Sequence, residues 1–236
     1  MNKYYDPKYV EKLFDKMSSS YSRMNYITSF GFSERWRKQC VNEIDLSNSK
    51  VIVDLLTGMG ECWKFIDRKA HKDAKIIGID FSEEMIKKAE KNTSKFKKRE
   101  IDVRRENVFT NSLADNSIDS VISGFGLKTF DTNQLTELAK EINRMLKVNG
   151  NFSLIDVSVP KNQLLRALYL FYLKHIIPIL GKLFLGDATA YKMLGKYTTE
   201  FQNAENVKQL FENQNFNVEY VSYFYGCASG IKGMKI

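Results

Sequence analysis

Short apolar runs of strand length alternate with amphipathic segments of helix length over the first two thirds of this chain. The segments between the runs repeat apolar residues every three or four positions, as residues 134–146 do. The apolar runs lie at residues 50–54, 75–80, 101–108, 117–123 and 151–157. Strands that alternate with helices in this way predict a parallel sheet with right-handed crossovers.

Turn and cap residues mark the boundaries of these elements. The helix that follows the first strand is expected to reach about residue 72. Ser82 supplies a hydroxyl N-cap ahead of two acids, which predicts the start of the next helix. The tripeptide Val-Asn-Gly at residues 148–150 is expected to turn the chain into the strand at 151–157.

The two ends of the chain depart from this alternation. Residues 1–45 carry aromatic and apolar side chains in helical segments and precede the first strand, so we expect a helical lid. Residues 164–185 are almost wholly apolar, but bases and Pro178 interrupt them. We expect a buried helical pair or lid over an apolar pocket; an interfacial membrane contact and, last, a membrane span are the alternatives.

The C-terminal part is expected to complete the sheet. A helix at residues 205–211 precedes two strands, at 217–225 and 228–235, that form a hairpin across Gly226. We therefore divide one domain into a lid (1–45), a cofactor-binding core (46–160), an apolar helical insertion over the substrate pocket (161–200) and a closing helix with antiparallel strands (201–236).

Composition narrows the range of partners. A length of 236 residues with 43% hydrophobic side chains suits one large α/β domain with additions. The net charge is +8, and much of it falls in residues 87–105. A solvated helix face explains this run, with attraction to anionic lipid or an acidic substrate as the alternative. Only Phe96 interleaves with these bases, so we expect no nucleic-acid partner.

Cysteine and histidine are too few and too scattered for a metal centre. Cys40, Cys62 and Cys227 form no C-x-x-C pair, and His71 lies far from His175 in the sequence. We expect no transition-metal site. Few cysteines and no apolar signal region at the N-terminus predict a cytoplasmic protein, with contact to the inner membrane face left open.

The clearest chemical signal is the turn after the first strand, in residues 51–61, Val-Ile-Val-Asp-Leu-Leu-Thr-Gly-Met-Gly-Glu. Gly58 and Gly60 have no Cβ, so the backbone can turn sharply and a ligand can come close. Asp80 ends the second strand on the same edge of the sheet. A carboxylate there can accept hydrogen bonds from a ribose diol.

The details favour S-adenosylmethionine over a dinucleotide. A dinucleotide fingerprint has a third glycine three residues after the second, where this chain has Trp63. S-adenosylmethionine has no pyrophosphate and does not need that glycine. Asp54 before the turn and Met85 after the second strand also fit a site for it. A nicotinamide cofactor and a purely structural turn are the alternatives.

A series of motifs runs in order along the chain. They are Met17-Ser-Ser-Ser-Tyr21-Ser-Arg-Met24-Asn25, Arg35-Trp36-Arg37, residues 54–61, Gly78-Ile-Asp80-Phe-Ser-Glu-Glu-Met85, Asp115-Asn-Ser-Ile-Asp119, Phe125-Gly-Leu127 and Leu154-Ile-Asp156-Val-Ser-Val-Pro160. With them the chain resembles the ubiquinone/menaquinone biosynthesis C-methyltransferase family over nearly its full length. The resemblance implies a Rossmann-like class I methyltransferase fold, a seven-stranded, mostly parallel α/β sheet with a C-terminal antiparallel hairpin and a helical lid.

The resemblance also implies where S-adenosylmethionine would sit. The glycine turn would lie under its methionine part, Asp80 would hold the ribose, and Tyr21 would close the site from the lid. Asn107 and Val108 stand where the family has an Asp-Ala pair at the adenine edge. The expected cofactor-binding residues are Tyr21, Asp54, Thr57, Gly58, Met59, Gly60, Asp80, Phe81, Met85, Asn107, Val108 and Ser123.

The chain departs from the family mostly on the substrate side, where the family's Arg-Asn after Phe-Gly-Leu is Lys128-Thr129. Attack by a ring carbon needs an electron-rich ring, so a base or a group that stabilises a phenolate is useful. Asp156 ends the fifth strand on the ligand-facing edge and Lys128 follows the fourth. The catalytic candidates are Lys128, Asp156, Tyr21, His175 and Tyr191.

Together these features predict an S-adenosylmethionine-dependent methyltransferase. Its expected acceptor is a ring carbon, or a hydroxyl, of an apolar aromatic small molecule, quinol-like or a natural-product intermediate. One alternative keeps the fold and cofactor but catalyses another reaction, such as a cyclisation. Another is a non-catalytic partner that assembles biosynthetic enzymes. A homodimer is left open.

Overall fold

A seven-stranded sheet forms the centre of the computed structural model, which describes residues 3–185 and 189–236. The strands stand in the order β3–β2–β1–β4–β5–β7–β6. Their bounds are β1 (Val51–Leu55), β2 (Lys75–Asp80), β3 (Ile101–Arg105), β4 (Ile118–Gly124), β5 (Leu146–Val157), β6 (Phe216–Tyr223) and β7 (Ala228–Lys235). Strands β1 to β5 pair in parallel, and β7 runs antiparallel between β5 and β6. The predicted α/β fold with its C-terminal antiparallel hairpin is confirmed.

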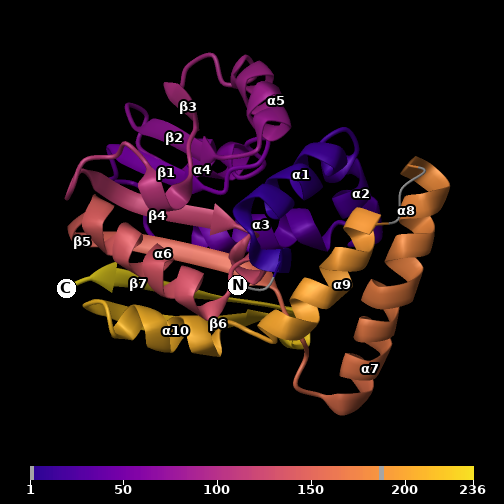
Figure 1. Ribbon diagram of the computed structural model, residues 1–236. Coiled ribbons are helices and arrows are strands. Elements are labelled where there is room, and N and C mark those ends of the chain that lie inside the picture. Colours follow the sequence, from indigo (N-terminus) through magenta and orange to yellow (C-terminus); the bar gives the residue numbers. More distant parts are fainter. Residues whose placement is uncertain (1–2, 186–188) are drawn as a thin grey trace.

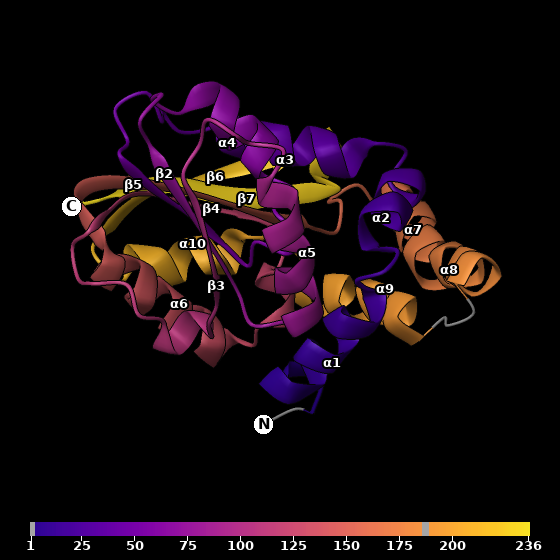
Figure 2. The same ribbon diagram turned by 90° about the horizontal axis from the view of Figure 1, so that it is seen from above.

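Helices cover both faces of the sheet (Figures 1 and 2). One face carries α3 (Phe32–Asn42), α4 (Trp63–Lys69) and α5 (Glu83–Thr93), and the other carries α6 (Thr132–Met145) and α10 (Glu205–Glu212). Helix α6 buries Leu135, Leu138 and Ile142, which recur at helical spacing, against the strands. An Asp131–Gln134 capping box fixes its first turn.

The remaining helices gather beyond the carboxyl ends of the parallel strands. They are α1 (Pro7–Met17), α2 (Tyr21–Thr28), α7 (Gln163–Phe171), α8 (Ile177–Leu185) and α9 (Thr189–Phe201), with a π-helical turn, η4 (Tyr172–Ile176), between α7 and α8. We call this group the helical cap. Figures 1 and 2 show its N-terminal part beside its C-terminal part, and the Tyr172 hydroxyl donates to the Thr28 carbonyl at 2.8 Å across the two.

The lid is shorter than the predicted residues 1–45. Helix α3 belongs to the layer on the sheet, because Cys40 and Val41 are fully buried in the same cluster as Ile52 of β1. Of the described part of the N-terminal segment, α1 and α2 lie over the strand ends, and Tyr4 and Tyr5 ahead of them pack against Met193 and Tyr197 of α9.

Several element boundaries also differ from the prediction. Strand β3 stops at Arg105, because Asn107 accepts a hydrogen bond from the Phe109 amide and starts a 3₁₀ turn. Strand β5 begins at Leu146, since Asn149 takes a left-handed φ of 64° and the pairing with β4 continues past an irregularity. Helix α4 ends at Lys69, short of residue 72.

One helical segment of the described chain, Gln163–Lys182, is long and apolar enough to cross a membrane by length and composition. Its mean hydropathy is 1.4, and 22% of its most apolar window is buried inside the protein. Core helices of soluble proteins pass the same test, so length and hydropathy do not make this segment a membrane span.

Candidate active site

The turn between β1 and α4 has the geometry that its glycines predict. Gly58 and Gly60 take φ values of 57° and 83°, which favour glycine over other residues. A Cβ on Gly60 would come within 2.4 Å of the Trp63 ring. The indole therefore fills the space beside the turn and packs the helix against the sheet.

Three carboxylates, from Asp54, Asp80 and Glu61, line a narrow cleft above this turn. Asp80 accepts hydrogen bonds from the Gly58 amide at 2.8 Å and the Ser82 amide at 3.0 Å. Asp54 accepts one from the Thr57 hydroxyl at 2.5 Å. All three acids lie at the carboxyl edge of β1 and β2, where parallel α/β sheets bind ligands.

Burial raises the pKa of two of these acids. The pKa of Asp54 rises to about 7, opposed by its hydrogen bond from Thr57 and reinforced by the nearby Glu61. The pKa of Asp80 rises to about 6, opposed by the Ser82 and Gly58 amides. A cation in the cleft would favour the ionised form of both carboxyls.

Arg37 is a base in the same cleft, and it comes from α3. Its side chain is buried, with its guanidinium 4.7 Å from the centre of the Phe125 ring and 4.0 Å from the Glu61 carboxylate. The cleft thus combines three acids with one base. This set matches a ligand that carries a sulfonium, an ammonium and a carboxylate, as S-adenosylmethionine does.

The cap closes this cleft tightly. The cleft holds about 40 Å³ of free space, little more than one water molecule. Phe14 of α1 and Tyr21 of α2 form its outer wall, and the Ser22 hydroxyl donates to Glu61 at 2.9 Å. The donor set therefore fits S-adenosylmethionine, and its entry requires α1 and α2 to move.

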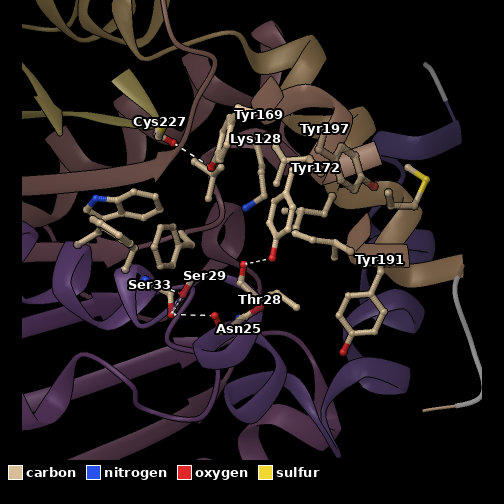
Figure 3. A pocket seen from close by; sticks show the side chains of 18 of the residues that line it. Asn25, Thr28, Ser29, Ser33, Lys128, Tyr169, Tyr172, Tyr191, Tyr197 and Cys227 are labelled. Carbon is tan, nitrogen blue, oxygen red and sulfur yellow. Dashed lines mark hydrogen bonds between the residues drawn. The ribbon is translucent and has the colours of Figure 1, made fainter. Parts of the chain in front are cut away.

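A larger, mostly apolar cavity of about 430 Å³ lies inside the helical cap (Figure 3). Side chains of α1, α2, α3, α7, η4 and α9 line it. The cavity and the cleft share four lining residues, Phe14, Tyr21, Phe125 and Thr129. The two chambers therefore meet end to end, the arrangement needed to bring an apolar molecule against a bound cofactor.

Lys128 places a charge in this apolar chamber. Its side chain is 9% exposed, and Figure 3 shows its ammonium directed into the cavity beside Tyr172. The ammonium donates to Asp156 at 2.7 Å. A buried lysine with one carboxylate partner can still donate to a second oxygen on a ligand.

Asp156 lies behind Lys128 and is fully buried. Its other carboxylate oxygen accepts from the amides of Gly126 and Lys128 at 2.9 and 3.0 Å, and its first oxygen also accepts from the Val157 amide. These donors hold both carboxylate oxygens in place. Asp156 thus positions Lys128 and the Gly126–Lys128 loop, and it does not line the cavity itself.

The structure brings two of the remaining catalytic candidates to the cavity. Tyr21 lines both chambers, and burial raises its pKa to about 12, so it is a neutral phenol at neutral pH. Tyr191 lines the cavity, but its hydroxyl shares a hydrogen bond with Ser20 at 3.2 Å and points away from Lys128 (Figure 3).

The structure does not bring His175 to the site. Its side chain is exposed on the outer face of η4 and stacks on Phe171, with ring centres 5.0 Å apart. The helix turns Leu173 and Ile177 toward the protein instead. The proposed catalytic role of His175 is therefore dropped.

Most of the expected cofactor-binding residues line the cleft or its extension. Cleft residues among them are Tyr21, Asp54, Thr57, Gly58, Asp80, Phe81 and Met85. Phe81, Asn107 and Val108 line a small hollow that shares Phe81 with the cleft. Three line neither the cleft nor this hollow. Met59 and Gly60 face an outer groove, and the Ser123 side chain is buried under the strand edge, where Gly124 and Gly126 take its place.

Several residues that line the cleft or the junction of the two chambers were not predicted as site residues. Among them are Phe14, Arg37, Glu61, Phe125 and Thr129. Arg37 and Glu61 lay within motifs that the resemblance singled out, yet no role was assigned to them. Phe14 carried no signal beyond an aromatic residue in a predicted helix.

Two of the solved structures that share this fold are described as S-adenosylmethionine-dependent methyltransferases, one of them as a putative one. One from Aquifex aeolicus superimposes with a TM-score of 0.62 and 16% identity over 85% of this chain and 89% of its own. A putative one from Methanococcus maripaludis gives a TM-score of 0.62 and 18% identity over 94% of each chain. At this identity the likeness establishes the fold.

In sequence, the chain is similar to bacterial demethylmenaquinone methyltransferases. A demethylmenaquinone methyltransferase of Lactiplantibacillus plantarum is 28% identical over 228 residues, 96% of this chain and 95% of that protein. One of Staphylococcus saprophyticus is 29% identical over 227 residues, 96% of each.

The fold, the acidic cleft and these relatives define an S-adenosylmethionine-dependent methyltransferase, with S-adenosylmethionine as the implied methyl donor. The chain belongs to the ubiE/COQ5 methyltransferase family, whose profile matches residues 1–235. The predicted resemblance, fold and enzyme class are confirmed.

Proposed function

We propose that this enzyme methylates a ring carbon of an apolar, quinol-like aromatic molecule held in the 430 Å³ cavity. The observation that carries the proposal is the junction of this cavity with the acidic cleft at Phe14, Tyr21, Phe125 and Thr129. A flat ring can lie among the aromatic side chains of the cavity, with its edge toward the cleft. The names of the bacterial relatives, demethylmenaquinone methyltransferases, support a quinol acceptor.

In this proposal the cleft residues hold S-adenosylmethionine by charge and hydrogen bonding. Asp80 would accept from the ribose hydroxyls in place of its present bonds to the Gly58 amide. Asp54 and Glu61 would face the cationic groups, and Arg37 would pair with the carboxylate. Phe81 and Val108 would border the adenine ring.

The reaction asks little covalent chemistry of the protein. S-adenosylmethionine would supply an electrophilic methyl group: its bond to sulfur would break as its bond to the ring carbon of the phenolate forms, with S-adenosylhomocysteine as the leaving group. The resulting dienone would regain its aromatic ring when the ring proton moves, through solvent, to the former phenolate oxygen. Lys128 stabilises the phenolate oxygen that makes the ring electron-rich, and Asp156 keeps the ammonium in place. Tyr21 and Phe14 close the junction against water.

This arrangement favours carbon over oxygen as the methyl acceptor. A phenolate oxygen bound to the Lys128 ammonium is engaged in a charge-assisted hydrogen bond, which lowers its reactivity. The ring carbons beside it keep the electron density that the oxygen supplies. Methylation at a hydroxyl would instead require that oxygen to leave Lys128 and face the junction.

A turnover assay tests the proposal. The purified protein is incubated with S-adenosylmethionine and a short-chain naphthoquinol or benzoquinol under reducing conditions, and products are analysed by mass spectrometry. We expect a product heavier by one CH₂ and an equal amount of S-adenosylhomocysteine. Bound S-adenosylmethionine with no methylated quinol or phenol would contradict the proposed acceptor class.

We also propose a cytoplasmic location. The three cysteines are free and buried, as suits a reducing compartment.

A further inference from the structure

Three exposed apolar side chains surround the mouth of the cavity. Phe30, Leu168 and Phe224 are 80%, 62% and 48% exposed, and all three also line the cavity. They come from three separate segments: the turn after α2, helix α7, and the 3₁₀ turn η5 (Phe224–Gly226). We call these three residues the cavity rim.

The outer face of α7 and α8 extends the rim. Leu164, Phe171 and Ile179 are 72%, 57% and 56% exposed. Their spacing of seven and eight residues puts them on one helical face. On the opposite face Leu173 and Ile177 are buried against the cap. This segment is therefore apolar on both faces, and we call the exposed one the outer stripe.

Within the segment that carries the outer stripe, the charges have one sign, although Lys161 at its start pairs with Glu205 of α10 at 3.7 Å. Residues 161–182 contain Lys161, Arg166, Lys174 and Lys182 but no Asp or Glu. These four side chains are exposed. Across the rim, Arg35 is exposed, and its guanidinium lies 5.7 Å from the centre of the Phe32 ring.

The nearest acid of α3, Glu34, is already bound to Lys64 at 2.6 Å. An apolar surface bordered by bases complements the headgroups and acyl boundary of an anionic bilayer. A second copy of the chain fits less well, because a two-fold contact between identical patches would bring bases together.

We propose that the cavity rim and the outer stripe dock this protein on a bilayer that contains anionic lipid. The mouth of the cavity then faces the acyl region, and an apolar molecule can pass from the bilayer to the cavity without crossing water. Helices α7 and α8 lie along the surface rather than across it. This inference goes beyond the proposed function, and its test needs neither cofactor nor substrate.

Vesicle sedimentation tests the docking surface. The full chain is mixed with vesicles of phosphatidylcholine alone or with added phosphatidylglycerol. We expect binding that requires phosphatidylglycerol and weakens with salt. The double variant Leu164→Gln/Phe171→Gln, outside the cavity lining, should lower the partition coefficient about tenfold or more. Lys174→Gln/Lys182→Gln should lower it by a similar factor.

Matched controls are available elsewhere on the protein. Val148→Gln removes an apolar side chain that is 62% exposed near the start of β5. Lys98→Gln removes an exposed base between α5 and β3. Both variants should bind vesicles as the parent does.

Three results would overturn the proposal. The first is equal binding to neutral and anionic vesicles, and the second is unchanged binding by both double variants. The third is a parent protein that binds no vesicles but forms a dimer in light scattering, with the dimer lost in Leu164→Gln/Phe171→Gln. Turnover of a short-chain quinol in lipid-free solution is measured separately. A docking failure with normal turnover would leave the proposed function intact, and the reverse result would leave docking intact.

Discussion

At the scale of single residues, the proposed chemistry depends on Lys128 and Asp156. The pair is buried, and the carboxylate has four donors while the ammonium still reaches the cavity. The proposed role of Lys128 is therefore electrostatic. The role of Asp156 is to hold Lys128 and the Gly126–Lys128 loop.

Lys128→Met keeps the length of the side chain and removes the charge. Because the ammonium stabilises a phenolate that exists only along the reaction, kcat for quinol methylation should fall about a hundredfold. The Kd for S-adenosylmethionine should stay within about twofold, as measured by calorimetry, because Lys128 does not line the cleft. An equal loss in kcat and in cofactor affinity would remove Lys128 from the substrate chamber.

Asp80→Ala tests the proposed contact between Asp80 and the ribose of S-adenosylmethionine. A ribose diol that loses a charged partner should bind S-adenosylmethionine more than about tenfold more weakly, since such bonds contribute about 1.5–3 kcal/mol. Asp73→Ala serves as the control, because the Asp73 side chain is 74% exposed. Calorimetry that gives the parent affinity for both variants would refute the assignment.

The acids of the cleft also predict a pH dependence. The pKa of Asp80 is raised to about 6 and that of Asp54 to about 7, and only their ionised forms attract a cation. The affinity for S-adenosylmethionine should therefore rise as pH increases from 5 to 8 (about one unit either side of the two pKa values). Asp54→Asn should flatten the upper part of this rise. An affinity that is constant or falls over this range would contradict the proposed charge pairing.

The same pKa shifts predict the opposite trend for the ligand-free protein. In the folded state both carboxyls hold protons that the unfolded chain releases near pH 4. Their contribution to stability is therefore complete below about pH 4 and is lost as pH rises through 6 and 7. Urea unfolding at pH 5 and pH 8, with and without S-adenosylmethionine, should show the ligand stabilising the protein more at pH 8.

At the scale of elements, the connection from β1 to α4 sets the shape of the cleft. Gly60→Ala places a Cβ within 2.4 Å of the Trp63 ring at a φ of 83°. We expect it to lower the free energy of unfolding by about 2 kcal/mol or more, measured in urea. Adding Trp63→Leu should make the double variant more stable than the sum of the two single effects. Strict additivity would mean that the indole does not set the requirement for glycine.

The sequence predicted the sheet better than it predicted the helical cap. Strands, glycine turn and closing hairpin follow from linear patterns, and the sequence predicted them. The role of α3 did not follow, because residues 1–45 have no feature that separates a lid helix from a helix on the sheet. His175 was misplaced because residues 164–185 are apolar on both faces, so their sequence does not reveal which face is buried.

The candidate site was predictable where the strands and the turn that follows them supply it. Asp54 and Asp80 come from the adjacent strands β1 and β2, Gly58 comes from the turn after β1, and their common edge follows from the parallel topology. Arg37 and Phe14 reach the cleft only through the packing of α3 and α1, which no local pattern encodes. Ser123 was placed wrongly because the strand ends one residue later than predicted, which gives the edge to Gly124.

At the scale of the whole molecule, the structure contains two adjoining chambers of different chemical character. The acidic cleft lies at the edge of the sheet, and the apolar cavity lies inside the helical cap, with an exposed apolar rim around its mouth. The cleft is nearly closed at about 40 Å³, so α1 and α2 must open to admit the methyl donor. The order of chambers, from apolar rim to acidic cleft, suits the proposed methylation of a lipophilic aromatic molecule that enters from a membrane surface.

The measurement that tests this account most directly follows the transferred methyl group. S-adenosylmethionine with a ¹³C-labelled methyl is incubated with the enzyme and a short-chain quinol, and the product is examined by NMR. The account predicts one labelled methyl bound to an aromatic carbon, and loss of that signal in Lys128→Met. A label on oxygen would contradict methylation at carbon, and its absence from every quinol tested would contradict the proposed acceptor.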